Sequence, residues 1–84
     1  MKFPLFSRVA FATDVPGDGI RRGDIATIVE YHAAPTSGGE PGYSVEVFNA
    51  LGKTIAVLTV SESHLEALRD DEVLRVRAWR TTAA

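Results

Sequence analysis

Few residues of this chain form a pattern known from catalytic or metal sites. The two histidines, His32 and His64, do not lie at metal-ligand spacing from each other or from a pair of carboxylates. Ser63, His64 and Asp70 have the residue types of a hydrolytic triad. However, adjacent residues of a short helix point in different directions, so Ser63 and His64 cannot make the contact between nucleophile and base. We therefore expect both histidines on the surface, and we predict no catalytic residue, no metal ligand and no cofactor.

Three aspartates in the glycine-rich segment from Asp14 to Asp24 suggest a calcium site. Their spacing is wrong for an EF-hand, which needs oxygen ligands at every second residue and a glutamate further along the chain. The glycines also lack the strand, the helix and the Lys-Ser/Thr pair of a phosphate-binding loop. Because aspartate side chains accept hydrogen bonds from nearby backbone amides in turns, we interpret the segment as a structural loop.

The same segment predicts where one strand ends and the next begins. Pro16 has no amide hydrogen to donate, so we expect it to end the first strand. Gly19 permits the positive φ of a tight reversal, and Ile20, an isolated apolar residue, is expected to anchor the loop to the core. Gly23 and Asp24 directly precede a run of β-branched and apolar residues that is typical of a buried strand.

The composition is that of a small globular domain. The 84 residues include 45% hydrophobic residues and carry a net charge of −2, so we expect one domain over residues 1–84, with an ordered core from about residue 6 to about residue 80. A chain this short buries roughly 60–65% of its unfolded surface, so association would add to its stability. The charge gives no basic footprint for nucleic acid or for a membrane surface.

Cysteine is absent, which removes disulfides, thiolate zinc sites and thiol nucleophiles. The N-terminal apolar run is broken before it reaches the length of a signal peptide, and no stretch approaches the roughly 20 apolar residues of a membrane span. We therefore expect a cytoplasmic protein.

Alternating apolar and polar residues predict five short strands. A helical turn over residues 61–68, with Ser63 and Glu66 as a capping box, is expected before the last strand. A bulge is expected at Ala26 and a positive φ at Gly52. The strands are expected over residues 8–13, 25 to 31 or 32, 43–49, 54–60 and 73–79.

Short antiparallel strands close most economically into a small barrel, because closure removes the exposed edges of a sheet. The expected fold is all-β, a small five-stranded SH3-like barrel with one short helical turn before the last strand. An oligonucleotide-binding-type barrel is the alternative, but that fold usually needs longer strands and a longer helix between the third and fourth strands.

Three segments resemble a known family. They read Val-Pro-x-x-Gly-Ile-x-x-Gly-Asp-x-x-Thr-Ile-Val-Glu from Val15 to Glu30, then Tyr-x-Val-Glu-Val-Phe from Tyr43, and Gly-Lys-Thr-x-Ala-Val-Leu-Thr-Val from Gly52. They are similar to a family of small bacterial proteins that carry a domain of unknown function, with Leu-Pro-x-x-Gly-Leu-x-x-Gly-Asp-x-Gly-Thr-Val-Val-Glu as its usual signature. Ala26 departs from this pattern, in which glycine is expected.

The resemblance covers about Phe6 to Leu68, and it implies an SH3-like barrel with no assigned activity. The turn at Gly23 and Asp24 resembles, more distantly, a turn of ribosome- and transcription-associated barrels.

Two surface features are candidates for binding. Arg75, Arg77 and Trp79 share one face of the last predicted strand, with Arg80 beyond it. Such residues stack on a base or grip a carboxylate. The alternative interpretation is a solvated strand face with Trp79 covering the end of the barrel.

The second feature is Phe48, an aromatic residue on the polar side of the third predicted strand, together with Ile55 and Val57 on the outward face of the fourth. An exposed aromatic beside apolar residues is typical of a self-association patch.

These observations predict a small noncatalytic interaction module that binds itself, as a homodimer or small homo-oligomer, or a protein partner. An antitoxin- or immunity-like regulator of a neighbouring enzyme is the alternative, and a nucleic-acid-binding barrel is the third hypothesis. No membrane partner is expected.

Overall fold

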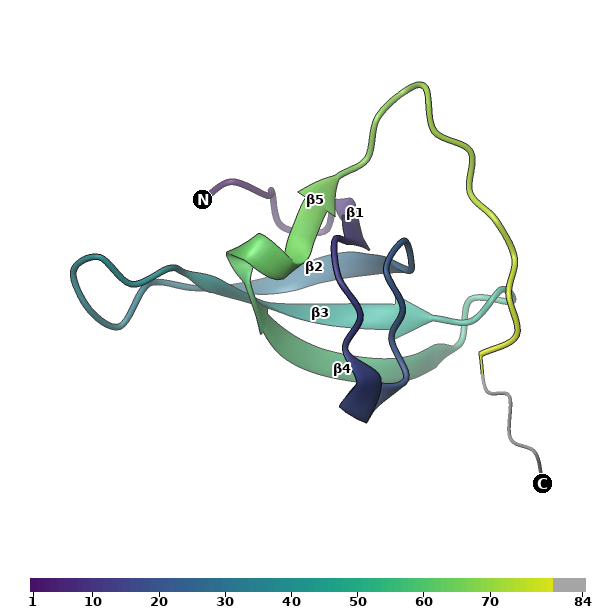
Figure 1. Ribbon diagram of the computed structural model, residues 1–84, viewed down its shortest axis with the longest axis horizontal. Helices are drawn as coiled ribbons and strands as arrows, with labels where there is room; N and C mark the ends of the chain where they lie inside the picture. Colours follow the sequence, from purple (N-terminus) through teal and green to yellow (C-terminus); the bar gives the residue numbers. More distant parts are fainter. Residues whose placement is uncertain (80–84) are drawn as a thin grey trace.

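The computed structural model describes residues 1–79 and contains one antiparallel sheet of five strands in the order β4-β3-β2-β1-β5 (Figure 1). A 3-10 turn, η1 (Pro16–Asp18), lies in the excursion between the first two strands, and a second, η2 (Glu62–His64), precedes the last. The strands are β1 (Arg8–Phe11), β2 (Ile25–His32), β3 (Gly42–Phe48), β4 (Thr54–Ser61) and β5 (Leu65–Ala67). The expected all-β class is confirmed.

The sheet is not closed into a barrel. β4 and β5 are its outermost strands, and in the described part of the chain no backbone ladder joins them. β5 has three residues and pairs only with β1, where Leu65 lies opposite Phe11. The expectation of a closed five-stranded barrel is therefore wrong, because the second edge of β5 does not pair with β4.

The expected last strand over residues 73–79 is also wrong. That segment is extended but joins no ladder, and β5 forms eight residues earlier, where a helical turn was expected. Of the helical turn expected over residues 61–68, only Glu62–His64 is helical. The capping box is absent because the Ser63 amide and hydroxyl both donate to the carboxylate of Glu40, at 2.7 and 3.1 Å.

The excursion between β1 and β2 is fastened to the core by Ile20, which is 1% exposed and forms a bridge with Val15. Gly19 has the expected positive φ, at 72°. Pro16 does not end β1, which stops at Phe11. It begins η1 instead, a position that suits its fixed φ and missing amide hydrogen.

Two further expectations concern backbone irregularities. Gly52 has a φ of 88°, as expected for the turn between β3 and β4. Ala26 is not bulged, because it pairs regularly with Val9. The register of β2 shifts at Val29 instead, between Ile28 and Glu30.

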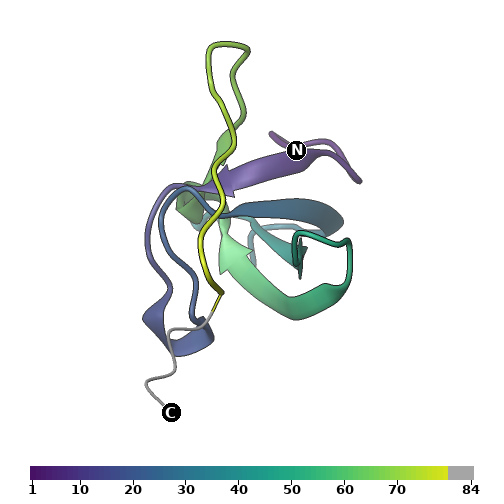
Figure 2. The ribbon, with the colours of Figure 1, turned by 90° about the vertical axis from the view of Figure 1, so that its right-hand side faces the viewer.

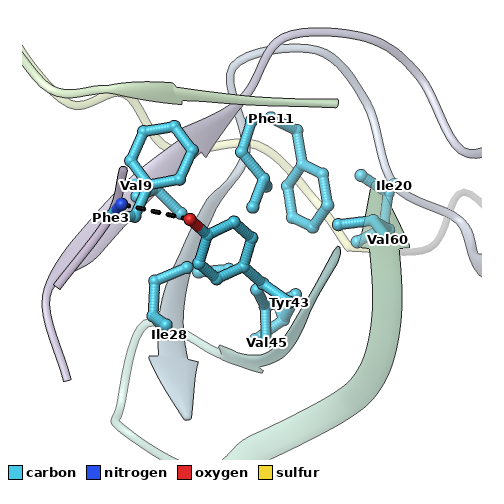
Figure 3. Packing of buried hydrophobic residues seen from close by; sticks show 11 residues of the cluster. Phe3, Val9, Phe11, Ile20, Ile28, Tyr43, Val45 and Val60 are labelled. Atoms are coloured by element: carbon cyan, nitrogen blue, oxygen red, sulfur yellow. Dashed lines mark hydrogen bonds between the residues drawn. The ribbon is translucent and has the colours of Figure 1, made fainter. Parts of the chain in front are cut away.

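Tyr43 lies at the centre of the core (Figure 3), and its side chain is fully buried. Its hydroxyl accepts hydrogen bonds from the amides of Lys2 and Phe3, at 3.0 and 3.2 Å, and donates to the carboxylate of Glu62 at 2.7 Å. The Phe3 ring also packs edge-on against the Tyr43 ring, at 5.4 Å between centroids. One side chain thus fastens the N-terminal segment to β3 and to η2.

Candidate functional site: a groove beneath the strap

The chain leaves the sheet after β5, turns, and runs back as an extended segment, residues 73–79, which we call the strap (Figures 1 and 2). The turn is closed by its own groups: the Glu72 amide donates to the Arg69 carbonyl at 3.2 Å, and the Arg69 amide donates to the Glu72 carboxylate at 2.6 Å. In Figure 2 the strap passes in front of β1 and descends beside the excursion that carries η1. The strap therefore lies against residues that precede it in the chain by more than fifty positions.

Arg77 fastens the strap to Asp24. Its Nε donates to one carboxylate oxygen at 2.8 Å and its Nη2 to the other at 2.5 Å, while Nη2 also donates to the Gly19 carbonyl at 3.0 Å. The two side chains are 26% and 16% exposed. This two-pronged geometry requires the planar guanidinium of arginine and is stronger than a single ion pair.

The carboxylate of Asp24 is also held by its own loop. Its Oδ2 accepts the Arg21 amide at 2.8 Å, and the Asp14 carboxylate accepts the Arg22 amide at 2.8 Å in the same loop. The expected turn role of these aspartates is confirmed for both residues. Asp24 thus closes its own turn through Oδ2, and both of its carboxylate oxygens accept hydrogen bonds from Arg77 of the strap.

The electrostatics of the pair follow from this arrangement. Burial of the Asp24 carboxyl raises its pKa, but the hydrogen bonds from Arg77 and Arg21 and the positive charges of both residues outweigh burial, so the pKa lies below its ordinary value. The hydrogen bond to Asp24 raises the pKa of Arg77 despite partial burial. Both groups are therefore charged at neutral pH.

Trp79 completes the fastening. Its indole is half-buried against the core cluster, and its ring centroid lies 5.5 Å from the Arg77 guanidinium carbon. A Cβ placed on Gly19 would lie 3.8 Å from the indole Cη2, so the ring packs closely over this glycine. The stacked guanidinium and indole form one recognition element on the strap.

A groove of about 560 Å³ lies between the strap and the sheet. It brings together most members of the two surfaces predicted separately from the sequence. The members that line it are Phe48 and Ile55 from β3 and β4, and Arg75, Arg77 and Trp79 from the strap. Val57, the remaining member, is 64% exposed and lies outside the groove.

A second cavity, of about 410 Å³, lies on the other side of the strap. Ala10 of β1, Ile25 of β2 and Glu66 of β5 contribute to its lining. Ala10 is only 5% exposed. Both cavities share the strap and Asp24 as walls, so the position of the strap determines the shape of each.

The polar residues considered for catalysis do not form a catalytic arrangement in residues 1–79. The Ser63 hydroxyl donates to Glu40, and His32 lies 2.8 Å from the Ser44 hydroxyl. His64 is half-buried, and its Nδ1 has no hydrogen-bond partner among residues 1–79. In this part of the chain no three histidine or acidic side chains gather as metal ligands do, and no helix is long and apolar enough to cross a membrane.

Residues 5–67 match the family model of a domain of unknown function, DUF4926. The chain belongs to the DUF4926 family. No curated protein matched, and no solved structure matched. The family therefore brings no assigned activity to the groove.

The DUF4926 match covers all five strands and ends at Ala67. Asp24, Gly19, Phe48 and Ile55 lie inside it, whereas the whole strap lies outside it. One wall of the groove thus lies within the matched residues and the other wall lies beyond them.

The pairing of Asp24 with Arg77 was not predicted from the sequence. Asp24 was interpreted as a turn residue, and Arg77 as part of a strand face. No periodic signal links two side chains 53 positions apart. Arg80, the fourth residue of the predicted arginine and tryptophan face, lies outside the described residues.

Proposed function

We propose that this chain is a small noncatalytic interaction module that binds polypeptide through the groove beneath the strap, with a second copy of the chain as its first partner. One observation carries the proposal. Phe48, Arg75 and Trp79, from separate parts of the sequence, line one groove. Aromatic residues and arginine are the side chains that most often anchor protein interfaces.

Exposed apolar side chains around the groove favour self-association. Phe48 and Leu74 line it and are 41% and 52% exposed, and Val76 of the strap is 87% exposed. A monomer rarely exposes apolar side chains in a continuous patch, and interfaces between identical chains are more apolar than the remaining surface. A net charge of −2 opposes such contact only weakly.

The charges that line the groove support a binding role over a catalytic one. Asp24 and Arg77 neutralise each other, and Arg75 makes no hydrogen bond or ion pair with another described residue. Arg75 lines the same groove as Phe48 and Trp79, and an arginine there suits contact with a carboxylate or a peptide carbonyl.

The test is the mass of the protein in solution as a function of concentration, measured by sedimentation. We expect wild type to associate and Phe48→Asp to shift the midpoint about tenfold or more toward higher concentration, because a carboxylate would then be buried in an apolar contact. Leu51→Asp is the matched control, since Leu51 is 95% exposed and does not line the groove. A monomer at all concentrations, or equal effects of the two substitutions, contradicts the proposal.

We also propose that the sheet is an opened SH3-like arrangement. The strand order β4-β3-β2-β1-β5, with a 3-10 turn before the last strand, supports this relation. An experimental structure in which β4 pairs with a different strand would contradict it.

A further inference from the structure

The site that receives Arg77 consists of residues of the loop between β1 and β2. The Arg21 amide donates to the carboxylate of Asp24, the Gly19 carbonyl accepts a hydrogen bond from Arg77, and Gly19 lies near the indole of Trp79. None of these receiving groups belongs to the strap. The site therefore recognises a guanidinium followed by an aromatic ring, whichever chain presents them.

The strap is held at few points. Within residues 1–79, the hydrogen bonds that it makes to the sheet and the excursion all come from Arg77. Val73 and Val76 are 92% and 87% exposed. No strap residue takes part in a strand pairing, so release of the strap leaves every pairing of the sheet in place.

The connection is long enough to reach a neighbour. Residues 68–76 join β5 to Arg77, and nine extended residues span roughly 30 Å. The principal extents of the molecule are 45, 31 and 20 Å. The hydrogen bonds that close the turn at Arg69 and Glu72 are local and exposed, so opening it removes no contact with the core.

We propose that the strap docks on the Asp24 site of a second copy of this chain, so that two copies exchange straps. A second copy presents the same arginine and tryptophan at the same spacing, and exchange of an identical element is a common route to dimers. The intramolecular contact competes with exchange, because a short connection gives an effective concentration in the millimolar range. Docking of the strap on a second copy is therefore measured best with variants in which the intramolecular contact between Arg77 and Asp24 has been removed. The proposal does not depend on what the groove at Phe48 binds.

Two complementary variants remove that competition. The donor is Asp24→Asn, which keeps its strap and has a weakened site. The acceptor is Arg77→Ala with Trp79→Phe, which keeps Asp24 and has a strap with neither anchor. Because Trp79 is the single tryptophan of the chain, the emission of the mixture reports the donor strap alone. We expect the donor to emit at longer wavelength than wild type and to shift back when acceptor is added, saturating at one to one.

The control acceptor carries Asp24→Asn in addition to the other two changes. Both acceptors retain Phe48 and Ile55 of the groove and lack Arg77 and Trp79, so they differ only at Asp24. Binding about tenfold or more tighter to the acceptor with Asp24 supports strap exchange. Equal binding to both acceptors, or no shift with either, overturns it and leaves the groove proposal standing.

Folding of each variant is verified by circular dichroism. If the donor fails to fold, a synthetic peptide of residues 73–79 replaces it, because a peptide needs no fold of its own. A peptide that binds the acceptor no better than the control acceptor overturns the proposal as well.

Discussion

Arg77 joins two parts of the chain through hydrogen bonds that only a guanidinium can make. Arg77→Lys keeps the charge but loses the two-pronged geometry. We therefore expect the strap to loosen and Trp79 to become more accessible, with a longer emission wavelength and stronger acrylamide quenching. Arg75→Lys, on the same strap, is the matched control. Equal changes for the two substitutions would show that charge alone holds the strap.

The pH dependence of the strap follows from Asp24. Its pKa in the folded protein lies below the ordinary value of 3.8, so the charged form stabilises the closed strap above that pH. This stabilisation is lost as the pH falls through the folded pKa, below 3.8. We expect Trp79 emission to shift to longer wavelength only in this acidic range, and Asp24→Asn to remove the transition. A midpoint near pH 6 would implicate a histidine instead.

At the scale of elements, β2, β3 and β4 were predicted closely because their signals are local. Alternating residues and a turn glycine, Gly52, specify a hairpin without help from the rest of the chain. The burial of Ile20 was also predicted, because an isolated apolar residue in a polar loop is stabilised mainly by packing into the core.

The last strand was not predictable in the same way. The alternation in residues 73–79 indicates a segment with one apolar and one polar face, but it does not indicate whether any strand has a free edge with which this segment can pair. β1 has two edges, and β2 and β5 take both of them. η2 directly follows β4, and the next residue, Leu65, pairs with β1 and so occupies its second edge. The same limit explains why the contact of Arg77 with Asp24 was missed.

Tyr43 ties three elements together, and its hydroxyl has a measurable role. Tyr43→Phe leaves the amides of Lys2 and Phe3 and the carboxylate of Glu62 without their shared partner. We expect a loss of about 1–3 kcal/mol in the free energy of unfolding. Urea denaturation measures this loss.

Tyr31→Phe is the control for that substitution. The Tyr31 ring packs against Tyr43 at 5.4 Å, but its hydroxyl makes no hydrogen bond with another described residue. A loss of stability in Tyr31→Phe as large as that in Tyr43→Phe would show that the loss does not come from the hydrogen bonds of the Tyr43 hydroxyl.

At the scale of the whole molecule, the sheet is complete without the strap. All five strands lie before residue 68. A chain that ends at Leu68 is therefore expected to keep the β signature in far-ultraviolet circular dichroism. It loses the contacts of Arg77 and Trp79, so its melting temperature is expected to fall by roughly 5–10 °C, since about 1 kcal/mol shifts a domain of this size by about 4–8 °C. Loss of the β signature would show that the strap is required for the fold.

The strap also follows every strand in the order of synthesis. Every residue of the five strands precedes Arg77 in the chain, and no strap residue takes part in a strand pairing, so strand pairing does not require the contact with Asp24. Interactions that form after the rate-limiting step slow unfolding and leave the folding rate nearly unchanged. We therefore expect the ion pair at Asp24 to act on the lifetime of the folded state: substitution of Arg77 should shorten that lifetime and leave the folding rate nearly unchanged.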